Sequence, residues 1–119
     1  MREVSPRLSV TKDGDVTVVV LTDRKILDEV NIMQIGEQLN ALAVAATTPR
    51  MVLDFVNVAH MSSSALGVLI TLNKRVRERK GELRLCNIQP AIYEIFVITR
   101  LNEIFQISAS RQEAVDSLK

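Results

Sequence analysis

Residues able to form covalent links or to bind metals are scarce in this chain of 119 residues. Cys86 is the only cysteine, so no disulfide can form within the chain. A single thiol of this kind is either a small core residue or a redox-active group. His60 is the only histidine. One histidine and one cysteine cannot supply the ligands of a zinc site, so we expect no bound metal.

Loops that cradle phosphates and turns that present catalytic serines are also missing. The four glycines, Gly14, Gly36, Gly67 and Gly81, are far apart and form no glycine-rich loop. A Ser–His–acid triad could be assembled only around His60, and no G-x-S-x-G turn surrounds the serines that follow it. We therefore predict that the protein is not an enzyme and has no catalytic residue and no cofactor.

Excess charge, aromatic side chains and long apolar runs are lacking as well. Lys and Arg number 15 against 14 Asp and Glu, and this balance argues against a nucleic-acid binder that relies on bulk positive charge. Aromatic residues make up 3% and tryptophan is absent, so no platform for stacking bases is expected. No apolar run approaches the ~20 residues of a membrane span, and residues 1–10 lack the apolar core of a secretory signal. We expect a cytoplasmic protein that neither binds nucleic acid nor inserts into a membrane.

Apolar residues are arranged alternately in strand-like runs and helix-like stripes. The run 16–21 is almost wholly apolar, as in a strand buried on both faces, and Asp13-Gly14 before it favours a tight turn. From Asp28, a good helix N-cap, the apolar spacing changes to 3 and 4 residues, and Pro90 and Ser110 are typical of later helix starts. Strands are predicted near residues 8–12, 16–21, 51–56, 83–86 and 104–107, and helices near 28–46, 62–80, 90–98 and 110–118.

The resulting order, β-β-α-β-α-β-α-β-α, indicates the α/β class. Strands that alternate with helices favour a largely parallel sheet covered by helices. We predict a layered domain with a four- to five-stranded mixed sheet and about four helices. No linker, repeat or low-complexity segment interrupts the pattern, so residues 1–119 are predicted to form a single domain.

The second predicted helix has an apolar stripe and a basic end. Its inward face is predicted to hold Ala65, Leu66, Leu69, Ile70, Leu72 and Val76. Its last turns contain Lys74, Arg75, Arg77, Arg79 and Lys80, followed by Gly81 as a terminator. Positive charge complements the dipole at a helix C-terminus. The basic run is therefore either a solvated helix end or a docking patch for an acidic partner.

Ser62, Ser63 and Ser64 lie where a predicted strand passes into this helix. In a parallel α/β sheet that junction is at the carboxyl ends of the strands, where such folds place their sites. One interpretation is structural, with Ser62 capping the helix and its neighbours as polar first-turn residues. The other is functional. A phosphate on an exposed serine would be tolerated by the helix N-terminus but would disrupt a partner docked there.

Several segments resemble the signature of STAS domains of the anti-sigma factor antagonist type. Val52–Phe55 is similar to the family's strand that contains an aspartate, and Met61–Leu69 to its serine turn entering a helix. Leu85–Ala91 is similar to the strand that leads into a Pro-Ala helix start, and Leu27-Asp28 to the pair before the first helix. The resemblance spans nearly the whole chain and implies a STAS-like fold with the element order given above.

The resemblance also implies a partner switch. In this family the unphosphorylated protein binds an anti-sigma factor of the histidine-kinase-like ATPase type and thereby displaces a sigma factor. The kinase then phosphorylates a serine, here Ser63 with Ser62 as the second choice, the complex dissociates, and a phosphatase reverses the step. The implied partner-binding residues are Asp28, Ser62, Ser63, Ser64 and Ala65.

Four features depart from the family pattern. Ser62 stands where the family usually has Asp, Ala65 replaces the usual Gly, and Arg100 occupies a position that is Gly in many members. The stretch Thr22 to Ile26 also makes the connection from strand to helix longer than is common in the family. A second function therefore stays open, in which the chain is a STAS adaptor subunit of a stress-signalling scaffold or of a lipid-transporter ATPase complex. A small enzyme or nucleotide binder that uses the serine turn is the third.

Overall fold

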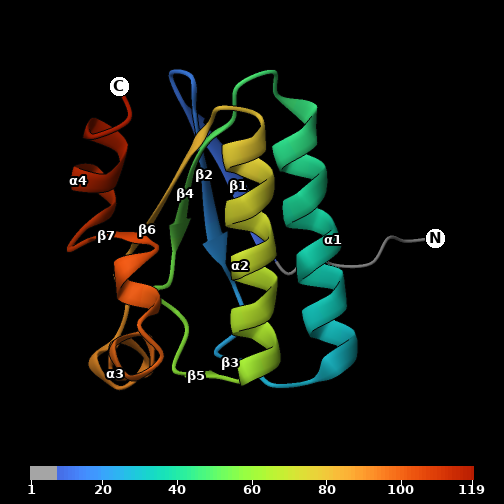
Figure 1. Cartoon of the computed structure of the whole chain (residues 1–119), viewed down its shortest axis with the longest axis vertical. Helices are drawn as coiled ribbons and strands as arrows, with labels where there is room; N and C mark the ends of the chain where they lie inside the picture. Colours follow the sequence, from blue (N-terminus) through green and yellow to red (C-terminus); the bar gives the residue numbers. More distant parts are fainter. Residues whose placement is uncertain (1–7) are drawn as a thin grey trace.

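A computed structural model describes residues 8–119, in which strands alternate with helices (Figure 1). Residues 1–7, on which the expectation of no secretory signal partly rests, lie outside the described residues. The strands are β1 (Leu8–Asp13), β2 (Val16–Leu21), β3 (Lys25–Ile26), β4 (Arg50–Asp54), β5 (His60–Met61), β6 (Glu82–Cys86) and β7 (Gln106–Ser108). The helices are α1 (Glu29–Ala45), α2 (Ser63–Glu78), α3 (Pro90–Ile98), a 3-10 helix (Leu101–Glu103) and α4 (Arg111–Asp116).

Five of the strands form one mixed sheet in the order β1-β2-β4-β6-β7. β1 and β2 form an antiparallel hairpin whose turn contains Gly14, with a φ of 64° that glycine adopts without strain. From β2 onward each strand is parallel to its neighbour, and each parallel connection crosses over through a helix. The α/β class and the mixed sheet are therefore confirmed, and the predicted order holds apart from three additional short elements: the two-residue strands β3 and β5 and the 3-10 helix.

The strands contribute alternate side chains to apolar cores on opposite faces of the sheet. Val19, Leu53 and Leu85 belong to the larger core, which α1, α2 and α3 cover. The smaller core, covered by α4, consists of Val16, Val18, Val52, Cys86, Ala114, Val115 and Leu118. Figure 1 shows α1 and α2 side by side, with α4 beyond β4 and β6. Burial on both faces explains why β2 has no polar–apolar alternation.

One residue of the predicted α2 stripe does not face inward. Ala65, Leu66, Leu69, Leu72 and Val76 are buried as predicted. The side chain of Ile70 is 42% exposed, so the prediction that it widens the inward face is wrong. Position 70 is rotated about 100° from Leu69 around the helix axis, which moves it off the stripe.

Two strand boundaries also differ from the predictions. β4 ends at Asp54 because its Oδ1 accepts the N–H of Val56 at 2.9 Å and turns the chain away, which leaves Val56 49% exposed. The last strand begins at Gln106 rather than at Ile104. The N–H of Ile104 donates to the carbonyl of Leu101 at 3.0 Å, so this residue closes the 3-10 helix.

α2 ends before Gly81, as predicted. Glycine often ends a helix by adopting the left-handed conformation, but Gly81 does not do so here. Lys80, not Gly81, has the left-handed conformation, with a φ of 60°. The N–H of Gly81 donates to the carbonyl of Val76 at 2.8 Å. A Cβ on Gly81 would collide with the backbone carbonyl of Pro49, so glycine is required there by close packing.

Candidate functional site

The serine turn begins α2, and its first serine is a structural cap. Ser62 has extended backbone angles, and its Oγ accepts the N–H of Ala65 at 3.3 Å. The carbonyl of Ser62 accepts the N–H of Leu66, which starts the helical ladder. The structural interpretation therefore holds for Ser62, whose hydroxyl satisfies one of the free donors at the helix start.

Ser63 and Ser64 differ from Ser62 because both are exposed in the first turn of α2. Within residues 8–119, neither side chain has a hydrogen-bond partner, so a hydroxyl that a modifying enzyme could reach is present at Ser63. Ala65, in contrast, is only 3% exposed. Its methyl group faces the core, and its side chain is therefore not available to a partner.

The pairing of β3 with β5 places the start of α1 next to the start of α2. The two strands are parallel, with Ile26 opposite Met61, and the N–H of Ser62 donates to the carbonyl of Ile26 at 3.1 Å. Asp28, two residues beyond Ile26, caps α1 because its Oδ1 accepts the N–H groups of Val30 at 2.9 Å and Asn31 at 3.1 Å. The starts of α1 and α2 therefore lie together, with the exposed Asp28 carboxylate and the exposed serines at one end of the molecule.

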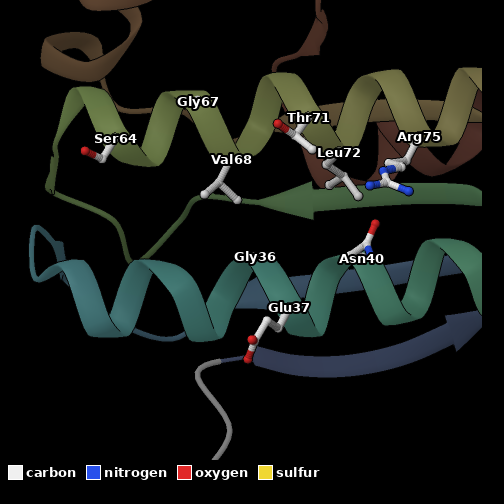
Figure 2. A pocket seen from close by; sticks show the side chains of 9 residues that line it. All are labelled: Gly36, Glu37, Asn40, Ser64, Gly67, Val68, Thr71, Leu72 and Arg75. Carbon is white, nitrogen blue, oxygen red and sulfur yellow. The ribbon is translucent and has the colours of Figure 1, made fainter.

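A groove continues from this end between the two helices. It has a volume of about 530 Å³ and is lined by Gly36, Glu37 and Asn40 of α1 and by Ser64, Gly67, Val68, Thr71, Leu72 and Arg75 of α2. Figure 2 shows Ser64 at one end and Arg75 towards the other. We call this feature the α1–α2 groove. Sequence reasoning missed it, because it depends on how two helices far apart in the chain pack together.

The basic run at the end of α2 is divided among different surroundings. Arg79 donates from Nε and Nη2 to the carbonyl of Ala46, at 3.0 and 2.9 Å, and so caps the C-terminus of α1. Arg75 lines the α1–α2 groove, whereas Lys74 and Arg77 line a hollow on the other side of α2. The run is therefore neither uniformly solvated nor a single patch.

A second feature that the sequence did not reveal is a polar cluster around Asp54 on the α4 side of the sheet. Asp54 is 1% exposed, and its Oδ2 accepts Arg111 Nε at 2.8 Å and pairs with Arg111 Nη2 at 2.8 Å. Its Oδ1 accepts Asn87 Nδ2 at 3.0 Å. The only signal in the sequence was an aspartate within an apolar strand, because its partners lie far along the chain. This cluster joins the start of α4 to the sheet.

Cys86 lies next to this cluster in the smaller core. Burial, and then the nearby Asp54 carboxylate, raise the pKa of the Cys86 thiol from 9.0 to about 12, although Arg111 opposes the rise. A thiol that stays protonated is a poor nucleophile. The structure therefore favours the interpretation of Cys86 as a core residue over a redox role.

Three further observations concern metal binding, membrane spans and backbone conformation. Within residues 8–119, no three His, Cys, Asp or Glu side chains are gathered so that they could hold a metal ion. No helix among these residues is long and apolar enough to cross a membrane. Arg100 has a φ of 63°, so it adopts the left-handed conformation that glycine takes without strain.

The fold is a layered α/β arrangement in which the starts of α1 and α2 are exposed at one end. The chain belongs to the STAS domain family, whose profile matches residues 7–114. A protein of Bordetella bronchiseptica named as the anti-sigma factor antagonist BtrV is 32% identical over 94 residues, which cover 79% of this chain and 80% of that protein. The anti-sigma-B factor antagonist of Bacillus subtilis is 36% identical over 59 residues, about half of either chain (50% and 54%).

Solved structures show the same fold. A STAS domain protein from Planctomyces limnophilus superposes with a TM-score of 0.86 at 24% identity, and the match covers 98% of this chain and all of that one (100%). The anti-sigma factor antagonist SpoIIAA in its unphosphorylated form superposes with a TM-score of 0.68 at 20% identity, over 92% of this chain and 96% of that one. Both similarities concern the fold alone.

Proposed function

We propose that this protein is an anti-sigma factor antagonist that binds an anti-sigma factor of the histidine-kinase-like ATPase type, and that phosphorylation of Ser63 releases the complex. The protein acts by binding rather than by catalysis, and a phosphatase restores the unphosphorylated form. The observation that carries the proposal is the difference within the serine turn: Ser62 is engaged as a cap, whereas Ser63 is exposed and its hydroxyl has no hydrogen-bond partner among residues 8–119. Similarity to proteins named as anti-sigma factor antagonists supports the choice of partner.

The geometry supports a switch that changes binding without unfolding the protein. A phosphoserine carries about −1.5 to −2 charges at neutral pH. At position 63 that charge lies in the first turn of α2, where backbone N–H groups and the positive end of the dipole stabilise an anion. A partner surface docked on the same end must bury the phosphate and the neighbouring Asp28 carboxylate together. Burying two like-charged groups is costly, so the complex dissociates.

The proposal is tested with the ATPase-type anti-sigma factors encoded in the same genome, each purified and incubated with this protein and ATP. We expect one of them to bind the unmodified protein and to transfer phosphate to it, and peptide mapping to place that phosphate on Ser63. Ser63→Ala should bind equally well and accept no phosphate there, and Ser64→Ala is the matched control. Phosphate found only on Ser62 would move the switch to the capping residue. Failure of every such anti-sigma factor to bind would refute the proposed partner.

A further inference from the structure

Two helical glycines line the α1–α2 groove without any need arising from packing inside the protein. Gly36 lies in the middle of α1 and Gly67 in the second turn of α2. Glycine within a helix lowers its stability relative to alanine. A Cβ on Gly67 would meet no atom within 4 Å, and one on Gly36 would come no closer than 3.4 Å to a methyl group of Val68. Alanine would therefore fit at both positions.

The other two glycines, unlike Gly36 and Gly67, are required by the fold. Gly14 has a positive φ in the hairpin turn, and Gly81 packs against the carbonyl of Pro49. Glycine is thus required by the fold at two positions, and the other two both open the same groove. An explanation consistent with the cost in helix stability is that something outside this chain approaches the backbone of α1 and α2 closely.

The groove also contains polar groups that the protein itself leaves unsatisfied. The Oδ1 atom of Asn40 is buried and has no hydrogen-bond partner within residues 8–119. Arg75 forms no ion pair in the same part of the chain. Figure 2 shows the Asn40 and Arg75 side chains pointing toward one another across the groove, whereas Glu37 points away from α2.

Apolar side chains line the groove from α2, where Val68 and Leu72 face it. Met33 and Val44 of α1 are 63% and 47% exposed but do not line it. The groove therefore has no side chain at either glycine, has apolar groups on its α2 wall, and has Arg75 towards one end.

We propose that the α1–α2 groove docks an amphipathic helix of the anti-sigma factor. The apolar face of that helix packs over Gly36, Gly67 and Val68, and a carboxylate on it pairs with Arg75. A helix fits because glycines on both walls allow a third helix axis to approach closely, and the unpaired guanidinium selects an acidic residue on it. This inference rests on the proposed function and extends the contact from the serine turn along the length of α2.

The first test fills the groove or reverses its charge and measures affinity for the purified anti-sigma factor. Gly67→Gln and Arg75→Glu should each weaken binding at least about tenfold, equivalent to about 1.4 kcal/mol. Ala41→Gln on the exposed side of α1 and Arg77→Glu on the other side of α2 are matched controls, because neither residue lines the groove. The controls should change affinity by no more than about twofold. Gly67→Gln should keep or raise the melting temperature, since it removes a helical glycine, so lost binding would not reflect unfolding.

A second measurement reports contact directly. Cys86 is buried with a raised pKa, so a cysteine introduced at Thr71 in the groove can be labelled selectively with an environment-sensitive fluorophore. Its emission should shift on addition of the anti-sigma factor, whereas a label at the exposed Thr11 of β1 should not respond. A shift produced by raising the concentration of this protein alone would mean that a second copy fills the groove, and the proposal would be wrong.

The outcomes separate this inference from the proposed function. If Ser63→Asp abolishes binding while Gly67→Gln and Arg75→Glu bind like the native protein, the switch stands and the groove proposal fails. If no ATPase-type anti-sigma factor binds the native protein, both proposals fail. Loss of binding in the groove variants alone, with folded proteins and intact controls, supports the docked helix.

Discussion

At the start of α2, two adjacent serines differ in their hydrogen bonding and exposure. Ser62 Oγ accepts the N–H of Ala65, whereas the Ser63 hydroxyl is exposed. Ser62→Ala should therefore lower the free energy of unfolding by about 1 kcal/mol, the usual cost of a lost N-cap. Ser63→Ala should change it by less than about 0.5 kcal/mol, as is typical of exposed positions. Urea denaturation of the two variants checks this, and equal losses would contradict the assigned roles.

A second prediction for a single residue concerns Cys86 and the pH dependence of the free energy of unfolding. The folded state raises the thiol pKa from 9.0 to about 12, so between these values the unfolded chain releases a proton that the folded protein keeps. The stability due to the protonated thiol is complete below pH 9.0 and is lost as the pH rises toward about 12. The free energy of unfolding should therefore fall more steeply with pH in this range for the native protein than for Cys86→Ala. Identical slopes for the two proteins would refute the assignment.

Among the elements, α4 is tied to the sheet by polar contacts at both ends, since Arg111 binds Asp54 at its start and Arg84 Nε donates to Ser117 Oγ, its C-cap, at 3.0 Å. Arg111 binds the buried Asp54 carboxylate through two nitrogens, each at 2.8 Å. Arg111→Ala should lower the free energy of unfolding by about 1.5–3 kcal/mol, the range for hydrogen bonds to charged groups. Lys119→Ala removes an exposed pair with Asp13 and should have little effect, which makes it the control. Chemical denaturation measures both, and a negligible loss for Arg111→Ala would show that its contact with Asp54 does not stabilise the packing of α4.

Local signals predicted the elements well because they act within a few residues. Asp28, Ser62 and Ser110 are the N-caps that the sequence indicated, and Pro90 begins α3. Capping depends on a side chain and the N–H two or three residues later, so it can be recognised without the fold. Ile70 failed because a rotation of one position around the helix separates a buried from an exposed side chain.

Features that depend on distant segments were not predictable in this way. The pairing of β3 with β5 joins two-residue strands too short for any periodic pattern. The ion pair between Arg111 and Asp54 joins residues 57 positions apart. The serine turn could be located as a candidate site because it follows a strand, whereas the α1–α2 groove exists only once the two helices pack together. That residues 1–119 form one domain stays a prediction.

At the scale of the whole molecule, one end gathers the residues on which the proposed switch depends. The starts of α1 and α2 meet there through β3 and β5, with the Asp28 carboxylate and the Ser63 hydroxyl exposed together. The larger core packs α1 and α2 against the sheet. Under the proposed function, a change of charge at Ser63 alters the surface at this end while leaving the packed interior unchanged, which is what a reversible switch of partners requires.

The most direct test of this account is the affinity of Ser63→Asp for the cognate anti-sigma factor, measured by titration calorimetry beside native protein. The carboxylate should leave the free energy of unfolding within about 1 kcal/mol of the native value, because the helix N-terminus accommodates it. It should weaken binding at least about tenfold, or about 1.4 kcal/mol. Binding by Ser63→Asp as tight as that of the native protein, together with an unmodified Ser63 after incubation with the kinase and ATP, would contradict the switch.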